Sequence, residues 1–175
     1  MTEDPTTEAE AEDEEGEVPA NAVRGRFVVT HADADSAVLK AVDGGQVHTL
    51  ATNPNLSEDD LVAATLAPEP PMEVTWRVVE LESQRALAIE HSPEPPTELA
   101  DELAAGQPTG EVTRQERAGE GELHVLTLSP GSVADAAAEV ADDEATRTVA
   151  ARVGARRVEL RTDEEEGVLS VRYLP

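Results

Sequence analysis

Alternating apolar and polar residues dominate the first half of the chain and predict a series of short β-strands. The predicted strands cover residues 24–31, 36–42, 46–51, 61–67, 72–78 and 85–90. Asp43-Gly44-Gly45 predicts a tight hairpin turn, because glycine tolerates positive φ. A further turn is expected near Glu82-Ser83. Six strands in such a short stretch indicate a small antiparallel barrel or curled sheet, of which the oligonucleotide/oligosaccharide-binding (OB) barrel is one example.

The pattern changes after the proline-rich segment 92–96, which we expect to be a stiff linker. Thr97 then begins a short helix that Gly106 ends. Further along, the periodicity predicts strands at 111–114 and 122–128, helices beginning after Ser132 and at Asp143, and a terminal hairpin of 157–162 and 168–173. This order, β-β-α-α-β-β, favours helices on one face of an antiparallel sheet.

The prediction is therefore an α+β protein in three parts. Residues 1–22 form an acidic tail that we expect to be disordered, because it has too few apolar residues to offset the entropy lost on ordering. Residues 23–92 form a β-rich subdomain, and residues 93–175 form an α+β subdomain.

Charge changes this picture most. The chain has 38 acidic and 13 basic residues and a formal net charge of −25. Only nine of the acids lie in the tail, so the folded part is acidic as well. Lys40 is the single lysine among the basic residues. Such a surface repels itself in dilute buffer, whereas in about 1 M salt the Debye length falls to ~3 Å and the repulsion is screened. The composition is typical of a halophile, so the acidity by itself predicts no cationic ligand.

Several protein classes are excluded by what the sequence lacks. The absence of cysteine rules out disulfides, thiolate catalysis and cysteine metal sites. The acidic N-terminus has no signal-peptide pattern, and the most apolar run, residues 61–67, is far shorter than the ~20 residues of a membrane span. We therefore expect a cytoplasmic protein without a membrane partner.

His31, Asp33 and Asp35 form a candidate polar cluster, because alternate positions of a strand share one face. The calcium-loop template does not fit, since its sixth position would be Val38 and its twelfth Gly44. A polar turn between two strands is the other interpretation. The remaining histidines match no zinc spacing, and His124 is expected to be a neutral residue within a strand. We predict no metal, no cofactor and no catalytic residue.

One stretch is basic within this acidic chain. Its five arginines form a candidate interaction patch for phosphate or an acidic partner: Arg147, Arg152, Arg156, Arg157 and Arg161. The same guanidinium groups could instead pair internally with nearby carboxylates. Nucleic-acid binding is disfavoured, because counterion release contributes little in concentrated salt.

Four segments carry a resemblance to a known family: 25–33, 67–76, 118–122 and 171–175. Over about residues 23–175 the chain resembles a haloarchaeal family classed only as a domain of unknown function. The resemblance implies a salt-adapted source and supplies no active residues.

Three functional hypotheses remain open at this point. The first is a non-enzymatic binding or accessory module. The second is an enzyme whose site lies between the two subdomains and uses His31, His124 and the arginines. The third is a protein-interaction adaptor that uses the acidic tail or the basic stretch 147–161.

Overall fold

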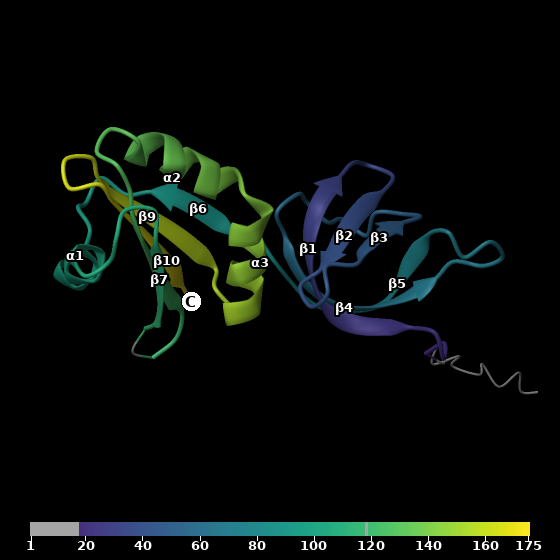
Figure 1. Cartoon of the computed structure of the whole chain (residues 1–175). Coiled ribbons are helices and arrows are strands. Elements are labelled where there is room, and N and C mark those ends of the chain that lie inside the picture. Colours follow the sequence, from purple (N-terminus) through teal and green to yellow (C-terminus); the bar gives the residue numbers. More distant parts are fainter. Residues whose placement is uncertain (1–17, 118) are drawn as a thin grey trace, which may run out of the picture.

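A computed structural model describes residues 18–117 and 119–175. It is a mixed α+β structure, as predicted, with a closed five-stranded barrel, a second five-stranded sheet and three helices (Figure 1). Most of the predicted acidic tail, residues 1–17, lies outside the described residues. Residues 18–22 form a short turn in which Ala22 N–H donates to Pro19 O.

The barrel contains strands β1 (Val23–Ala32), β2 (Ala37–Ala41), β3 (Val47–Leu50), β4 (Leu61–Pro68) and β5 (Trp76–Arg85). Their order around the barrel is β1-β2-β3-β5-β4, and β4 pairs back to β1. The pair β3–β5 is parallel, while the others are antiparallel. This is the Greek-key arrangement of an OB barrel, so the predicted barrel is confirmed.

The barrel core is aliphatic, with Phe27 as its one fully buried benzene ring. Inward-facing residues alternate along the strands, as in Leu39 of β2 and Leu50 of β3. Leu56, from the connection between β3 and β4, packs into the same core, and Trp76 is half-buried against it. The interior is thus filled with side chains and leaves no central channel for a ligand.

Two details of the strand prediction were wrong. Met72 and Val74 are 77% and 71% exposed and lie in the turn before β5, which begins only at Trp76. The turn predicted at Glu82-Ser83 lies inside β5, which stays paired with β4 as far as Arg85. Two register shifts in this ladder let the long strand curl around the barrel without a turn.

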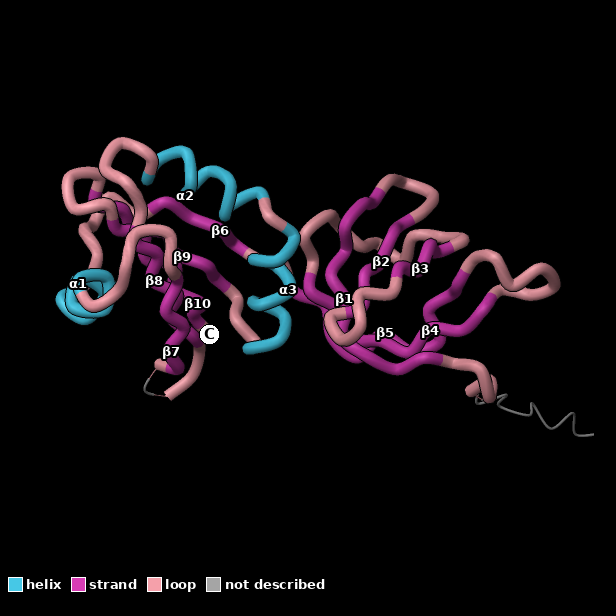
Figure 2. Tube along the Cα trace, viewed as in Figure 1, coloured by secondary structure: helices cyan, strands magenta, loops and turns pink. Residues whose placement is uncertain are grey.

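The second sheet has the order β6-β9-β10-β8-β7 (Figure 2). Its strands are β6 (Ala88–His91), β7 (Val112–Glu116), β8 (Glu122–Thr127), β9 (Arg157–Asp163) and β10 (Val168–Leu174). The predicted β-β-α-α-β-β order is observed from β7 to β10. The sixth predicted strand, β6, joins this sheet as an edge strand parallel to β9, and not the barrel.

Helices cover both faces of this sheet. Helix α1 (Glu98–Ala105) packs on one face against β8 and β10, and α2 (Val133–Asp142) and α3 (Glu144–Val153) cover the other. Thr97 caps α1 by accepting from Ala100 N–H, as predicted. Ser132 precedes α2 but makes no capping bond. Instead the Glu164 carboxylate, from the β9–β10 turn, accepts from Ala134 N–H and supplies the negative charge that a helix N-terminus favours.

Helix α3 lies between the sheet and the barrel (Figure 1). Val28 and Leu61 of the barrel belong to the same buried cluster as Ala151 of α3. Around this contact Arg147 pairs with Asp59, and Lys40 Nζ lies 2.9 Å from Glu144 Oε2. The two halves therefore share part of one hydrophobic core.

Candidate functional site

The candidate site is a groove between the second sheet and the α2–α3 corner, which we call the helix-side groove. It has a volume of about 330 Å³. Its apolar walls include Leu126 of β8, Val171 of β10 and Val149 of α3. The polar residues of its lining are Arg114, His124, Asp143, Thr146, Arg152 and Tyr173. The other hollows of similar size are lined by fewer titratable groups.

At the floor of the groove, His124 and Glu122 form a buried pair. Both residues belong to β8 and lie two positions apart on one face of the strand, and His124 lines the groove. His124 Nε2 lies 2.8 Å from Glu122 Oε1. Because a carboxylate can only accept, Nε2 carries the proton and the other ring nitrogen, Nδ1, has a free lone pair. Nδ1 has no partner among the described residues and is not a buried atom, and His124 lines the groove.

Burial fixes the protonation of this pair. Desolvation lowers the pKa of His124, although the Glu122 carboxylate opposes the shift, so the ring is neutral near pH 7. Burial on its own would raise the pKa of Glu122, but hydrogen bonds from His124 and Arg152 lower it below its usual value. The site therefore holds a neutral imidazole oriented by an anionic carboxylate.

Two guanidinium groups flank the histidine. Arg114 of β7 stands directly opposite His124 in the β7–β8 ladder. Arg152 reaches over from α3, and its Nη2 lies 3.3 Å from Glu122 Oε2. Among the described residues, Arg114 has neither an ion-pair nor a hydrogen-bond partner, so its five N–H donors are available to a ligand.

Tyr173 of β10 completes the polar set. Its ring packs on His124, with 4.9 Å between ring centroids. Burial raises the pKa of the Tyr173 hydroxyl to about 12, so the group stays protonated and can donate a hydrogen bond. The groove thus offers cationic and neutral donors, one imidazole acceptor and apolar walls, which together suit a small molecule with an acidic group.

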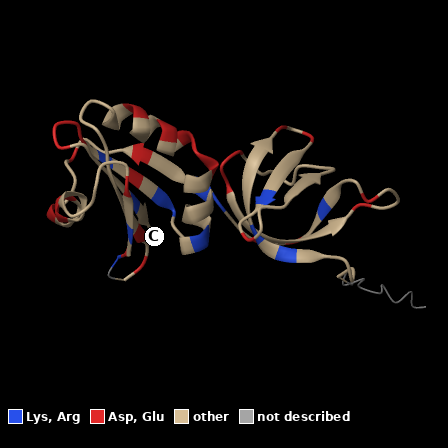
Figure 3. Cartoon of the chain, viewed as in Figure 1, with Lys and Arg blue, Asp and Glu red and all other residues tan. Residues whose placement is uncertain are grey.

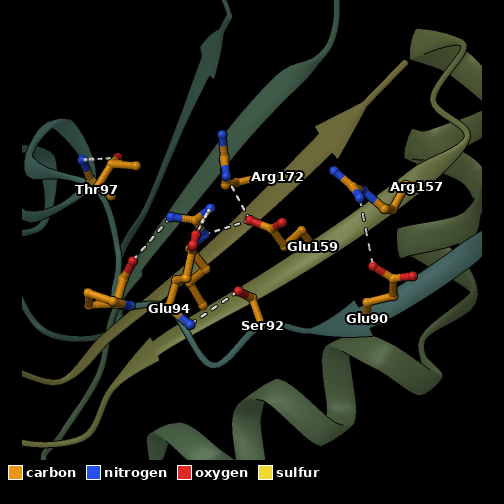
Figure 4. Close-up of polar contacts among 10 residues, drawn as sticks. Glu90, Ser92, Glu94, Thr97, Arg157, Glu159 and Arg172 are labelled. Atoms are coloured by element: carbon orange, nitrogen blue, oxygen red, sulfur yellow. Dashed lines mark hydrogen bonds and ion pairs between the residues drawn. The ribbon is translucent and has the colours of Figure 1, made fainter.

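The structure distributes the five predicted arginines over several places. Arg147 faces the barrel, bonded to Asp59, and only Arg152 lines the groove. Arg157 lies 4.0 Å from Glu90, on the opposite face of the sheet from the groove (Figure 4). Arg156 is exposed and has no side-chain partner among the described residues.

Arg161 belongs to a polar network on that opposite face. Its guanidinium lies 2.5 Å from Glu159 and 2.7 Å from Glu94, and Arg172 Nη1 lies 2.6 Å from the same Glu159 oxygen (Figure 4). Desolvation opposes ionisation of Glu159, but the two arginines outweigh it and lower the pKa of the carboxyl. These arginines thus have internal partners.

His31, Asp33 and Asp35 lie together at the turn between β1 and β2, away from the groove. Asp33 Oδ1 accepts from Asp35 N–H at 2.9 Å and from Ser36 N–H at 2.7 Å, and these bonds lower the pKa of Asp33. His31 Nε2 lies 3.8 Å from Asp33 Oδ2, and both side chains are exposed. In the described part of the chain, no group of three or more His, Asp or Glu side chains is placed to hold a metal ion.

Sequence reasoning missed most of the groove. His124 was expected to be a neutral strand residue and had a role only in the enzyme hypothesis, and Tyr173 was assigned no role. Their alternate positions on strands were visible in the sequence, but the signal that joins them is the register of β7 and β10 on β8, which only the fold provides.

Comparisons with known proteins place the chain in a family. A model described as "Family of unknown function (DUF5812)" matches residues 23–162, from the first residue of β1 into β9. No curated protein and no solved structure matches the chain significantly. In the described residues, no helix has the length and apolar character needed to cross a membrane. Since the match covers the barrel and every strand of the second sheet except β10, which is well over half of the chain, the chain belongs to this family of unknown function.

Proposed function

We propose that the chain is a non-enzymatic binding module whose helix-side groove takes a small molecule with a carboxylate or phosphate group. The observation that carries this proposal is Arg114, which lines the groove beside His124 and Tyr173 without a protein acceptor for its guanidinium. A planar guanidinium binds carboxylate or phosphate through two parallel hydrogen bonds. The carboxylate or phosphate oxygens of a ligand would supply the hydrogen-bond acceptors that the Arg114 guanidinium lacks among the described residues of the protein.

Size and lining support the same ligand class. The volume of about 330 Å³ lies at the small end of the ~300–1,000 Å³ range of ligand sites. Val149, Val171 and Leu126 would contact the apolar part of such a molecule. The donors of Arg114, Arg152 and Tyr173 would hold its acidic end.

An enzyme that uses the same groove is the second candidate, because the oriented imidazole of His124 lines the groove and its Nδ1 has a free lone pair. A neutral histidine held by a carboxylate can accept a proton from a bound molecule. His31 takes no part in this arrangement, since it lies on the barrel turn. The two candidate functions differ in the fate of the ligand: a binding module releases it chemically unchanged, whereas an enzyme releases a product.

We expect Arg114→Gln to weaken binding of benzoate and phenyl phosphate at least tenfold, about 1.4 kcal/mol. Both probes combine an acidic group with an apolar ring, and they separate carboxylate from phosphate recognition. Heteronuclear NMR titration in about 1 M KCl, where long-range charge effects are screened, measures the affinity. Resonances of β7, β8 and α3 should shift in the wild type.

Arg156→Gln is the matched control, because Arg156 is exposed, unpaired among the described residues and outside the groove. It should bind both probes like the wild type. Equal weakening by the two substitutions, or shifts confined to the barrel, would contradict the proposed site. Release of phenol from phenyl phosphate would favour the enzyme instead.

We also propose that the protein works in the cytoplasm of a halophile. The support is the net charge of −25, with acidic side chains spread over both halves (Figure 3). Raising KCl from about 0.1 M to 3 M should then increase the thermal unfolding temperature by several degrees, because salt screens the carboxylate repulsion. Circular dichroism measures the unfolding temperature. A variant that begins at residue 18 should keep most of its increase with salt. An unchanged unfolding temperature would argue against a salt-adapted protein.

A further inference from the structure

A small cavity lies where the barrel meets α3, and it shares no residue with the helix-side groove. Its volume is about 70 Å³. The residues that matter for its chemistry come from β1, β5 and α3: Arg26, Ser83, Arg85 and Ala151. Phe27 and Leu61 provide apolar surface. A site of this size takes a water molecule or a small inorganic ion, and it is well below the ~300 Å³ of organic-ligand pockets.

Arg85 gives the cavity an unsatisfied donor. Its Nε atom is buried and has no hydrogen-bond acceptor among the described residues. No carboxylate of the described chain forms an ion pair with Arg85 either. Arg85 itself is half-buried, but a buried N–H without an acceptor is a costly arrangement that a bound partner would relieve.

Arg26 adds a second guanidinium that also joins the two halves. Its Nη1 donates to the carbonyl oxygens of Ala151 at 3.4 Å and Arg152 at 2.9 Å, in the last turn of α3. Its one nearby carboxylate is that of Asp43, 3.7 Å from Nη2 and largely exposed. Arg26 is thus positioned by two neutral carbonyls and has one long, exposed ion pair.

The composition of the lining is unusual for this chain. Although the protein has 38 acidic residues, no Asp or Glu lines the cavity in the described structure. Two arginines and the hydroxyl of Ser83 line it instead. A water molecule could accept from Arg85 Nε–H but would leave the positive charge unneutralised. A monovalent anion both accepts the hydrogen bond and neutralises the charge.

We propose that this cavity binds chloride, held by Arg85 and Arg26 with Ser83 at its side. Chloride accepts several N–H and O–H donors at once and fits the available volume. Because Arg26 also holds the end of α3, an ion here stabilises the contact between barrel and helix. The site is independent of the groove ligand and differs from the general salt effect, since screening needs no particular anion.

The test is the ³⁵Cl NMR line width of dilute KCl on addition of the folded protein. A bound chloride that exchanges quickly broadens the line, and bromide should reverse the broadening by competition. We expect Arg85→Met to weaken chloride binding at least tenfold. Arg77→Met is the matched control, because Arg77 lies on the same strand outside the cavity and faces Glu69; it should retain the broadening.

Ser83→Ala provides a second variant in case Arg85→Met does not fold, since Ser83 is exposed and its replacement is structurally mild. It should weaken chloride binding severalfold. Wild-type protein without broadening means that water alone occupies the cavity, and the proposal is then wrong. Broadening that survives both Arg85→Met and Ser83→Ala in folded protein would likewise overturn it. Neither result bears on binding of benzoate in the groove.

Discussion

Replacing Gly167 by alanine should cost about 3–4 kcal/mol of unfolding free energy, the largest effect that we expect from a single methyl group. Gly167 is buried after the Asp163–Glu166 turn, at φ +70°. A Cβ atom there would lie 2.0 Å from the carbonyl oxygen of Leu128. Leu128 N–H donates to Gly167 O at 2.7 Å, so the two backbones cannot separate without losing this bond. The loss of unfolding free energy in Gly167→Ala is therefore the sum of two costs, the left-handed backbone strain and the steric overlap with Leu128.

Gly44→Ala separates the two contributions. Gly44 also has a positive φ, +83°, but a Cβ atom there meets nothing within 4 Å. Only the left-handed strain of about 1–2 kcal/mol should appear. Urea unfolding at one fixed KCl concentration measures both variants. Equal losses for Gly44→Ala and Gly167→Ala would show that the close approach of Leu128 does not limit position 167.

Local patterns in the sequence predicted most of the elements. Asp43-Gly44-Gly45 marked the hairpin, alternation marked β1 and an apolar run marked β4, because in these segments the local preference agrees with the fold. Met72 and Val74 show where this fails. They alternate like a strand, yet prolines at positions 70 and 71 hold them in the exposed turn before β5. An alternating pattern shows that apolar and polar side chains take turns along the chain, but it does not show that a partner strand is present to pair with.

The candidate site was less predictable than the fold, because it depends on register and on helix placement. Proximity in the sequence suggested one patch of arginines, but Arg147, Arg152 and Arg161 point to the barrel, the groove and the opposite face of the sheet. Conversely, Arg114 and Tyr173 are far apart in the sequence and meet only through β8. Long-range pairing of this kind leaves no local signal.

Acidity did not point to the sites that we propose, for a physical reason. Exposed carboxylates solvate a surface, whereas a binding site needs groups that are partly buried and lack protein partners. Arg85, whose Nε is buried and without an acceptor among the described residues, meets that description, whereas Arg114 is exposed and lacks only the protein partner. Both are cations in a protein of strongly negative charge. An unpaired cation marks a candidate site only where it also lines a hollow, since Arg156 is unpaired among the described residues but lies outside both the groove and the small cavity.

His48 gives the second large expected effect. The ring is 1% exposed inside the barrel, edge-on to Phe27 and Trp76, and neither ring nitrogen has a hydrogen-bond partner among the described residues. Unsatisfied buried groups of this kind cost about 1–3 kcal/mol each. Leucine has a similar volume and no polar atoms, but it loses aromatic contacts worth about 1 kcal/mol. His48→Leu should therefore stabilise the protein by about 1–2 kcal/mol at neutral pH.

The same substitution should flatten the pH dependence of stability. Desolvation lowers the pKa of His48 in the folded state below the ordinary 6.5, and no charged group contacts the ring to oppose this. The unfolded chain thus binds the proton more tightly, so wild-type stability is complete above pH 6.5 and falls as the pH decreases from there. Urea unfolding between about pH 7.5 and pH 5 should show a shallower fall for His48→Leu, with a residual slope from His124, whose pKa is also lowered. His91 is exposed and provides the control: His91→Leu should leave the fall in unfolding free energy unchanged. If wild type and His48→Leu instead have identical pH profiles, the His48 ring reaches water in the folded barrel, which would contradict the prediction.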